Sequence, residues 1–160
     1  MAIDLDRIRN WRRVYGVSHG SVYNDDHQEA LSEQLCSPIL VDVVDGCLVI
    51  SDISATYIAS SYVRGKVETA RLLQSNLNEL KEPGALRDLT APLTIRDAMR
   101  LVLALDEGYL WTDCLCVVQD AGPTEMAKVL GAMAHIYASA DHTLVVAGGM
   151  DASHGLGCLE

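Results

Sequence analysis

The stretch Tyr109–Gly122, YLWTDCLCVVQDAG, gives the first indication of the fold. Its apolar run over residues 109–118 is nearly continuous, which is typical of a strand buried on both faces of a parallel sheet. A buried carboxylate is unfavourable unless it is hydrogen-bonded or paired. Yet Asp113 lies inside the run, and Gln119 and Asp120 follow it. The stretch therefore predicts a core strand whose polar residues have a role beyond packing.

Helical patterns flank this strand. In LTIRDAMRLVLALDEG, Thr94 and Asp97 have the spacing of a capping box and Gly108 follows the last apolar turn, which predicts a helix. A second helix is expected from Pro123 to about Tyr137, followed by a strand in HTLVVAGG. Alternating helices and strands predict right-handed crossovers. The expected fold is a three-layer α/β domain, with a mostly parallel sheet flanked by helices.

The patterns upstream predict shorter elements. They are a helix over residues 3–14, a polar loop over 16–37, a strand over 56–63 and a helix from about Glu68 to Leu80. Between the loop and the strand, VDVVDGCLVI predicts a β-hairpin that turns at Asp45-Gly46, because such a turn needs a positive φ at both positions. The N-terminal part is thus expected to add a helix and a hairpin to the α/β core.

The composition excludes several classes of protein. A chain of 160 residues with 49% apolar residues suits one folded domain. Its formal charge of -10 argues against binding to nucleic acid or to an anionic membrane surface. No apolar stretch reaches the roughly 18 residues of a membrane-spanning helix, and the start MAIDLDRIRN lacks the apolar core of a signal peptide. We therefore expect a cytoplasmic protein.

The cysteines predict neither disulfides nor a metal site. Cys36, Cys47, Cys114, Cys116 and Cys158 are odd in number and lack the spacing of a disulfide framework or a zinc site. Alternation along a strand would place Cys114 and Cys116 on one face, where core packing is the favoured interpretation. The sequence predicts no metal and no cofactor.

Two groups of residues match the pattern of a known family. The first group, in chain order, is Thr94, Ile95, Asp97, Ala98, Tyr109, Leu110, Trp111, Asp113, Leu115, Cys116, Gln119, Asp120, Met133, Ile136, Tyr137, Ala140, Gly155 and Leu156. The second group, in TYIASSYVRG, is Tyr57, Ala59, Ser61, Tyr62 and Gly65. With these residues the chain resembles the fungal heterokaryon incompatibility (HET) domain. Trp11 and His19 also match a segment that commonly precedes that domain.

The chain departs from the family pattern at four positions. Arg64 stands where the family has tryptophan, and Ser60 stands where it has leucine. Tyr15 and Val22 stand where the preceding segment has cysteines. If those cysteines bind a metal together with the histidine in other members, this chain cannot do so. The resemblance therefore indicates a stand-alone, diverged member. It implies a single HET-like domain over residues 1–160, with an extension (1–55) and a core (56–160).

The resemblance also implies a function. HET domains are thought to be similar to TIR domains, which are flavodoxin-like modules of cell-death signalling, and some TIR domains cleave NAD with a glutamate. The chain is accordingly expected to act in fungal non-self recognition or regulated cell death, by self-association or with another signalling protein. The alternative is an enzyme acting on a small molecule, in secondary metabolism or by NAD cleavage. The sequence leaves open whether the chain is catalytic.

A candidate site follows from the place of the polar residues. In a parallel sheet the ligand crevice lies beyond the carboxyl ends of the strands, where Gln119 and Asp120 are expected either to contact a ligand or to form a turn. Asp113 either anchors a neighbouring loop through backbone amides or works as a polar group with Arg64 as its partner. The forked donors of Arg64 suit an anionic group, although a solvated surface role is equally compatible with the sequence.

The predicted site residues fall into two sets. The catalytic candidates are Asp113, Arg64, Ser61 and Gln119, and the ligand-binding candidates are Tyr62, Gly65, Asp120, Trp111 and Cys116. Further candidates are His135, His142 and His154 as acid–base groups, and Glu125 and Glu160 as the glutamate of a TIR-like NAD-cleaving enzyme. Ser61 has no obvious histidine partner in the sequence, so a nucleophilic triad is not indicated.

Overall fold

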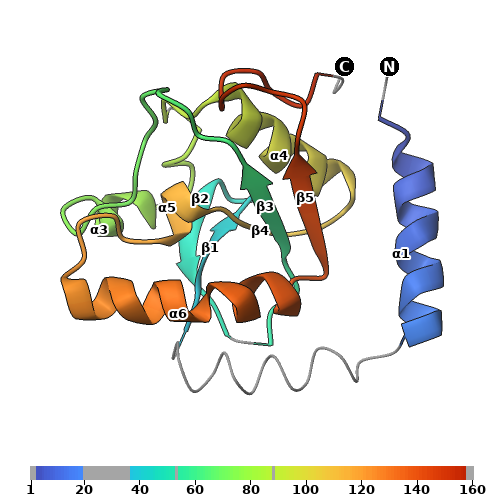
Figure 1. Cartoon of the computed structure of the whole chain (residues 1–160), viewed down its shortest axis with the longest axis horizontal. Helices are drawn as coiled ribbons and strands as arrows, with labels where there is room; N and C mark the ends of the chain where they lie inside the picture. The colour runs from blue at the N-terminus through green and yellow to red at the C-terminus, as the bar shows by residue number, and fades with distance from the viewer. Residues whose placement is uncertain (1–2, 20–36, 53, 88, 158–160) are drawn as a thin grey trace.

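A five-stranded sheet forms the centre of the fold (Figure 1). The computed structural model describes residues 3–19, 37–52, 54–87 and 89–157. Across the sheet the strands are β2 (Cys47–Ile50), β1 (Ile39–Asp42), β4 (Tyr109–Trp111), β3 (Ile58–Tyr62) and β5 (His142–Val146). β3 is parallel to β4 and β5, whereas β1 is antiparallel to β2 and β4.

The sheet is therefore mixed, and the prediction of a mostly parallel sheet is corrected. The sequence patterns correctly predicted the parallel strands of the α/β core. Because the β1–β2 hairpin pairs with β4, it belongs to the same sheet and adds antiparallel pairs to it. The flavodoxin-like layering stays a prediction.

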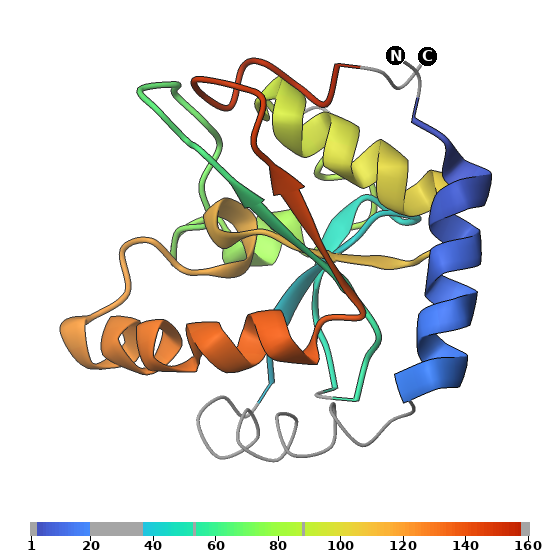
Figure 2. The same cartoon turned by 45° about the vertical axis from the view of Figure 1, so that its right-hand side comes forward.

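The helices flank the sheet. They are α1 (Leu5–His19), α3 (Leu77–Leu80), α4 (Leu93–Ala104), α5 (Asp113–Cys116) and α6 (Pro123–Ser139). α4 and α6 lie on opposite sides of the sheet (Figure 2). No helix in the described part of the chain is long and apolar enough to cross a membrane.

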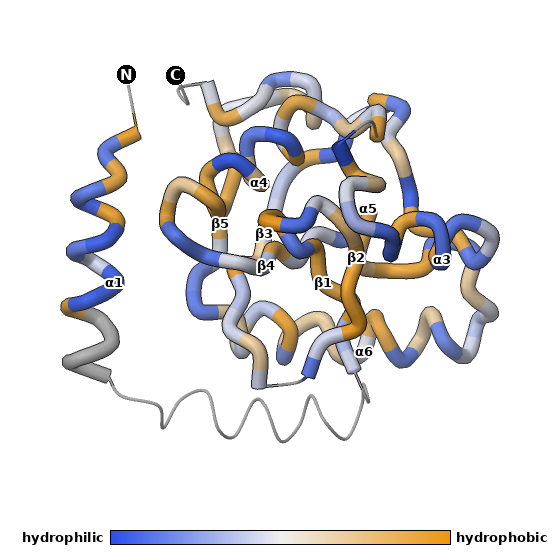
Figure 3. Tube along the Cα trace, turned by 180° about the vertical axis from the view of Figure 1, so that it is seen from behind, coloured by the Kyte–Doolittle hydropathy of each residue, from blue (hydrophilic) through white to orange (hydrophobic). Residues whose placement is uncertain are grey.

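The core lies between these helices and the sheet. Its largest fully buried side chains are Trp111, Tyr57, Leu40, Leu48, Leu72, Ile95, Leu110, Leu115 and Ile136. The Tyr57 hydroxyl donates a hydrogen bond to the Ile136 carbonyl at 2.5 Å, so this buried phenol is not left without a partner. The Trp111 ring meets the Tyr137 ring edge to face, with 5.4 Å between centroids. Apolar segments gather in the central strands, whereas α1 is mostly hydrophilic (Figure 3).

The hairpin is confirmed, but its turn differs from the prediction. β1 and β2 are joined by residues 43–46 rather than by two residues, and of these only Gly46 has a positive φ (65°). The Asp42 carboxylate accepts hydrogen bonds from the backbone N–H groups of Val44 and Asp45, both at 2.9 Å. This side chain stabilises the longer turn, which is why Asp45 does not need the left-handed conformation.

The predicted helix from Glu68 to Leu80 is wrong over most of its length, because only α3 is helical. Upstream of α3, the backbone of Leu72 bonds to the segment around α5 instead. Its N–H donates to the Cys114 carbonyl at 2.9 Å, and its carbonyl accepts the Gln119 N–H at 2.8 Å. These long-range bonds hold the segment outside a helix, although its sequence favours one.

The predicted strand over residues 109–118 is also corrected. β4 ends at Trp111, and the Thr112 carbonyl accepts the N–H groups of Leu115 and Cys116, which begins α5. Cys114 and Cys116 therefore do not share one face of a strand. Periodicity cannot distinguish a buried strand from a buried helical turn in a short apolar run, and here the run contains both.

α1 is held to the body by arginines. Arg12 Nη2 lies 2.8 Å from Asp141 Oδ2 and also pairs with the Glu107 carboxylate. Arg9 donates to the Ala104 carbonyl at 2.6 Å, at the C-terminus of α4. The predicted N-terminal helix is confirmed, and it extends into the predicted loop; residues 20–36 of that loop lie outside the described residues.

Asp141 should make this attachment sensitive to acid. The hydrogen bond with His142, together with the charge of Arg12, holds the pKa of Asp141 below its usual value, against the opposing effect of partial burial. A carboxyl group whose pKa is lower in the folded than in the unfolded state stabilises the fold at pH values above its unfolded-state pKa, which is about 3.9 for aspartate. This stabilisation is lost as the pH falls through the folded-state pKa. Replacing Asp141 with asparagine should therefore cost about 1 kcal/mol near neutral pH.

The measurement is the free energy of unfolding of the natural chain and of Asp141→Asn, from neutral to acidic pH. The difference between them should be constant from neutral pH to about pH 5 and should shrink at lower pH, disappearing once the pH is below the lowered pKa of Asp141. Asp106→Asn is the control, because the Asp106 side chain is 84% exposed and its pairing with Arg9 should contribute little. A pH-independent difference for Asp141→Asn would contradict the assignment.

Candidate functional site

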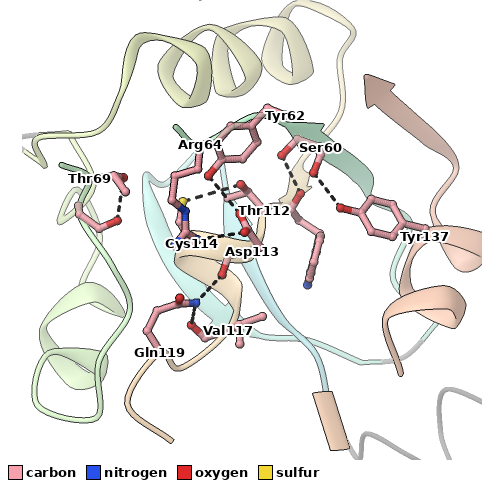
Figure 4. Close-up of polar contacts among 12 residues, drawn as sticks. Ser60, Tyr62, Arg64, Thr69, Thr112, Asp113, Cys114, Val117, Gln119 and Tyr137 are labelled. Carbon is pink, nitrogen blue, oxygen red and sulfur yellow. Dashed lines mark hydrogen bonds and ion pairs between the residues drawn. The ribbon is translucent and has the colours of Figure 1, made fainter. Parts of the chain in front are cut away.

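Polar side chains meet where the parallel strands β3 and β4 end (Figure 4). β3 ends at Tyr62, and Arg64 follows two residues later. β4 ends at Trp111, and Asp113 begins α5 directly beyond it. Carboxyl ends of neighbouring parallel strands lie at the same edge of a sheet. The three side chains of Tyr62, Arg64 and Asp113 therefore come together, and we call them the Asp113 cluster.

The cluster is held by two hydrogen bonds to one carboxylate. Arg64 Nη2 donates to Asp113 Oδ2 at 3.0 Å, and the Tyr62 hydroxyl donates to Asp113 Oδ1 at 3.1 Å. The pairing of Arg64 with Asp113 that the sequence predicted is thus present. Among the described residues, both carboxylate oxygens bond to side chains and neither bonds to a backbone amide. The ion pair is partly open to solvent, with side-chain exposures of 30% for Arg64 and 42% for Asp113.

The electrostatics keep Tyr62 and Arg64 each in one protonation state near neutral pH. Burial raises the pKa of Tyr62, and Cys114 and Asp113 raise it further, so the phenol stays a donor. Partial burial lowers the pKa of Arg64, but the charge of Asp113 and the effects of Tyr62 and Cys114 together outweigh this, so the pKa is raised overall. The positive charge of Arg64 is matched by Asp113. An anionic ligand would therefore have to displace this carboxylate to use the guanidinium.

The neighbouring cysteines are poor nucleophiles. Burial raises the pKa of both the Cys114 and the Cys116 thiols, so neither is a thiolate near neutral pH. Thr112 contacts both, with its N–H 3.3 Å from the Cys116 sulfur and its hydroxyl 3.8 Å from the Cys114 sulfur. Within the described residues, no group of three or more His, Cys, Asp or Glu side chains is placed to hold a metal ion.

Gln119 and Asp120 hold loops together. Gln119 Nε2 donates to the carbonyls of Asp113 (3.0 Å) and Val117 (2.9 Å), which closes the end of α5. Asp120 Oδ1 accepts the Gln74 N–H at 2.8 Å, and its carbonyl accepts Gln74 Nε2 at the same distance. These contacts are those of turn residues. Gln119 supports the backbone of Asp113, and its predicted catalytic role stays a prediction, as does ligand binding by Asp120.

The other candidates are spread around the cluster. Ser61 is half-buried on β3 opposite Val145. Gly65 has a φ of 64°, and a Cβ there would collide with the Asp151 Cβ. Trp111 is only 1% exposed and Cys116 7%, so both pack in the core. The catalytic role of Ser61 and the ligand-binding roles of the other three residues also stay predictions.

The candidate acid–base groups lie apart from the cluster. His142 bonds to Asp141 at 2.8 Å, His135 is half-buried on α6, and His154 is exposed. Glu125 is on α6, 3.1 Å from Lys128. Glu160 lies outside the described residues.

Sequence reasoning missed a strap, residues 151–157, that links β3 to α4. The predicted capping box at the start of α4 is wrong, because Pro92 occupies the cap and no side chain bonds there. Instead, Thr94 Oγ1 accepts the Gly155 N–H at 3.2 Å, and Asp97 Oδ2 accepts the Leu156 N–H at 3.0 Å.

The strap also reaches the Asp113 cluster. Its Ala152 accepts the Thr94 N–H at 3.1 Å and donates its own N–H to the Arg64 carbonyl at 3.3 Å. The backbone that carries Arg64 is thus tied to the first turn of α4. The signal for the strap was present in the family pattern, which places a Gly-Leu pair after the Thr and Asp of the helix start.

A mostly apolar pocket lies away from the cluster. It has a volume of about 450 Å³ and is lined by Ile39, Cys116, Val117, Met126, Val129 and Ile136 among others. Its walls are mostly apolar, with Gln74, Glu125 and Lys128 as polar members. Tyr62, Arg64 and Asp113 line neither this pocket nor two further ones of about 420 and 250 Å³.

The comparison with protein families matches this part of the fold. The family described as heterokaryon incompatibility protein (HET) matches residues 57–160, which include β3, β4, the Asp113 cluster and the strap. The chain belongs to the HET family. The β1–β2 hairpin precedes the matched residues but shares the HET sheet through β4. No curated protein and no solved structure matches the chain.

Proposed function

We propose that this HET-family chain is an association module of fungal non-self recognition or regulated cell death, and that it acts by binding rather than by catalysis. The observation that carries the proposal is the internal pairing of the Asp113 cluster. The Tyr62 hydroxyl and one N–H of Arg64 are bonded to Asp113, which also balances the charge of Arg64, and the nearby thiols are protonated. A catalytic site would need at least one of these groups free to meet a substrate.

The family name supports this interpretation, because heterokaryon incompatibility is a response to a foreign cell. A module of this kind works by changing its association with itself or with another protein. The body of the domain offers exposed apolar side chains for such contacts, including Val145 (66% exposed), Leu130 (63%) and Val63 (56%).

The first test is the size of the purified chain over a wide concentration range, by analytical ultracentrifugation. We expect a reversible increase in mass with concentration. We also expect that Asp113→Asn folds, loses no more than about 1 kcal/mol of stability because its ion pair is partly exposed, and associates normally. Expression in a fungal host, with cell viability as the readout, tests the biological part. A chain that stays monomeric and leaves the host unharmed would contradict the proposal.

An enzyme remains the second candidate, for one reason. The Asp113 cluster lies at the carboxyl ends of parallel strands, where α/β proteins place their ligands, and its ion pair is partly open to solvent. Incubation with NAD and with a fungal metabolite extract, followed by mass spectrometry, tests this candidate. Turnover by the natural chain that is lost in Asp113→Asn would favour the enzyme, and absence of turnover in both favours the association module.

A further inference from the structure

The free edge of β5 carries backbone groups that no strand in the described part of the chain binds. β5 pairs only with β3 and is the last strand on its side of the sheet. Successive residues of a strand direct their N–H and C=O groups to opposite sides, so about half of these groups in β5 point away from β3. Such an edge is prone to pair with a strand of another molecule unless something prevents it.

The sequence of β5 does not guard this edge. Edge strands are commonly guarded by charged residues, prolines or bulges. Residues 142–150 contain no Asp, Glu, Lys, Arg or Pro, and the pairing with β3 is regular from His142 to Val146. Protection of the edge therefore depends on what lies beside the strand.

α1 lies beside this edge (Figures 1 and 2). Covering an edge strand with a helix is another way in which proteins prevent pairing at the edge of a sheet. Ile3, Leu5 and Ile8 pack against the hydrophobic core, so this side of the N-terminal segment faces the body of the domain. α1 is thus placed to act as the cover of β5.

The apolar part of the attachment of α1 is small. The three side chains that pack against the core are only half-buried. Farther along the helix, Trp11 and Val14 are 57% and 51% exposed. No side chain described in α1 is fully buried. The polar contacts of the helix must therefore contribute much of what holds it in place.

Arg12 makes the polar attachment next to β5. Its Nη2 lies 2.8 Å from Asp141 Oδ2 and also pairs with the Glu107 carboxylate. The Asp141 N–H donates to the Tyr57 carbonyl at 2.9 Å, which fixes the residue directly before β5 to the sheet. The Arg12 side chain is only 22% exposed, so water screens these ion pairs less than it screens pairs on the open surface. A single side chain thus ties α1 both to the loop after α4 and to the start of β5.

We propose that α1 is a releasable cover of β5, and that the pairing of Arg12 with Glu107 and Asp141 keeps this cover closed. While α1 is in place, it occupies the side of β5 on which another strand would have to bind. When α1 is released, the unguarded edge opens to a strand of a second copy. The inference deepens the proposed association function by naming what restrains it, and only the consequence for assembly rests on that function.

Amide hydrogen exchange, measured by mass spectrometry, tests the cover in the natural chain, Arg12→Ala and Arg13→Ala. Arg12→Ala removes charge-assisted bonds to two carboxylates, so exchange in β5 should become about tenfold faster. Exchange in β2, at the opposite edge of the sheet, should not change. Arg13→Ala is the matched control, because Arg13 is exposed and donates to Asn10 Oδ1 of the same helix at 3.2 Å. This control should exchange like the natural chain.

Arg12→Lys separates a local release of α1 from a general loss of stability. Lysine keeps the positive charge but lacks the forked donors that pair with two carboxylates at once. Exchange in β5 should therefore lie between that of the natural chain and that of Arg12→Ala. If Arg12→Ala accelerates exchange in β2 as much as in β5, the substitution loosens the whole domain and Arg12 does not hold a cover.

Sedimentation equilibrium of the same proteins separates the cover from the association function. Faster exchange in β5 together with stronger association of Arg12→Ala supports both. Faster exchange in β5 of a chain that is monomeric at every concentration supports the cover and contradicts the association function. If the natural chain associates, but Arg12→Ala changes neither the exchange in β5 nor the association, the cover is wrong and the association function stands.

Discussion

Replacing Trp111 with alanine is expected to lower the free energy of unfolding by about 3–5 kcal/mol. The Trp111 side chain is 1% exposed and is the largest fully buried side chain in the core. Its removal leaves a cavity and abolishes the edge-to-face contact with Tyr137, whose ring centroid is 5.4 Å away. The free energy comes both from the lost apolar burial and from the incomplete collapse of the cavity.

Denaturant unfolding measures this effect, with Trp11→Ala as the matched control. Trp11 is 57% exposed and contacts the body of the domain little, although Arg7 lies 4.9 Å from its ring centre. The control should therefore lose less than about 1 kcal/mol. Equal losses for the two tryptophans would mean that Trp111 does not pack as the structure shows.

Trp111 also connects the core to the Asp113 cluster. Its carbonyl accepts the Ser60 hydroxyl at 3.3 Å, and Asp113 follows two residues later. A shift of β4 into the cavity would move Asp113 relative to Arg64, which follows the end of β3. The ion pair should thus weaken in Trp111→Ala even though Trp111 does not contact either charged group.

Local patterns predicted the elements that depend on local interactions. α6 begins at Pro123, as its sequence indicated, because the fixed φ of proline suits the first turn of a helix. The β1–β2 hairpin was recognisable from two β-rich runs around Asp45-Gly46. In both cases the residues that decide the structure are close together in the chain.

Other elements depend on partners that are distant in sequence. Leu72 lies outside a helix because its backbone bonds to residues 114 and 119, more than 40 positions away. Thr94 and Asp97 have the spacing of a capping box, yet they bind Gly155 and Leu156. A spacing rule cannot reveal such contacts, because the competing partner becomes visible only once the chain has folded.

The candidate site likewise combines contacts that could be predicted from the sequence with contacts that could not. The pairing of Arg64 with Asp113 could be predicted, because both follow strands whose ends should meet and they have opposite charges. The part played by the Tyr62 hydroxyl could not be predicted, since β3 had to end at Tyr62 for its side chain to reach Asp113. The contacts of the strap were equally hard to predict, because the Gly155-Leu156 pair of the family pattern does not reveal which residues it binds.

The strap yields the second large prediction, in which Gly155→Ala is compared with Gly157→Ala. Both glycines have a left-handed backbone, with φ of 72° and 73°. A side chain in this conformation costs about 1–2 kcal/mol. A Cβ at Gly155 would also come within 2.7 Å of Asp97 Oδ2 and 2.8 Å of the Leu93 Cγ, whereas a Cβ at Gly157 would meet no atom of the described residues within 4 Å.

Gly155→Ala should therefore lose about 1–3 kcal/mol more than Gly157→Ala, because crowding against α4 adds to the backbone strain. Denaturant unfolding of the two variants measures this difference directly, since the strain common to both cancels. Crowding at Asp97 also displaces the acceptor of the Leu156 N–H, so the strap should loosen from α4 and release its hold on the Arg64 carbonyl. Faster amide hydrogen exchange at Ala152 and Leu156 in Gly155→Ala, but not in Gly157→Ala, would show that loosening. If the two variants are equally stable, the strap does not pack on α4 and cannot position Arg64.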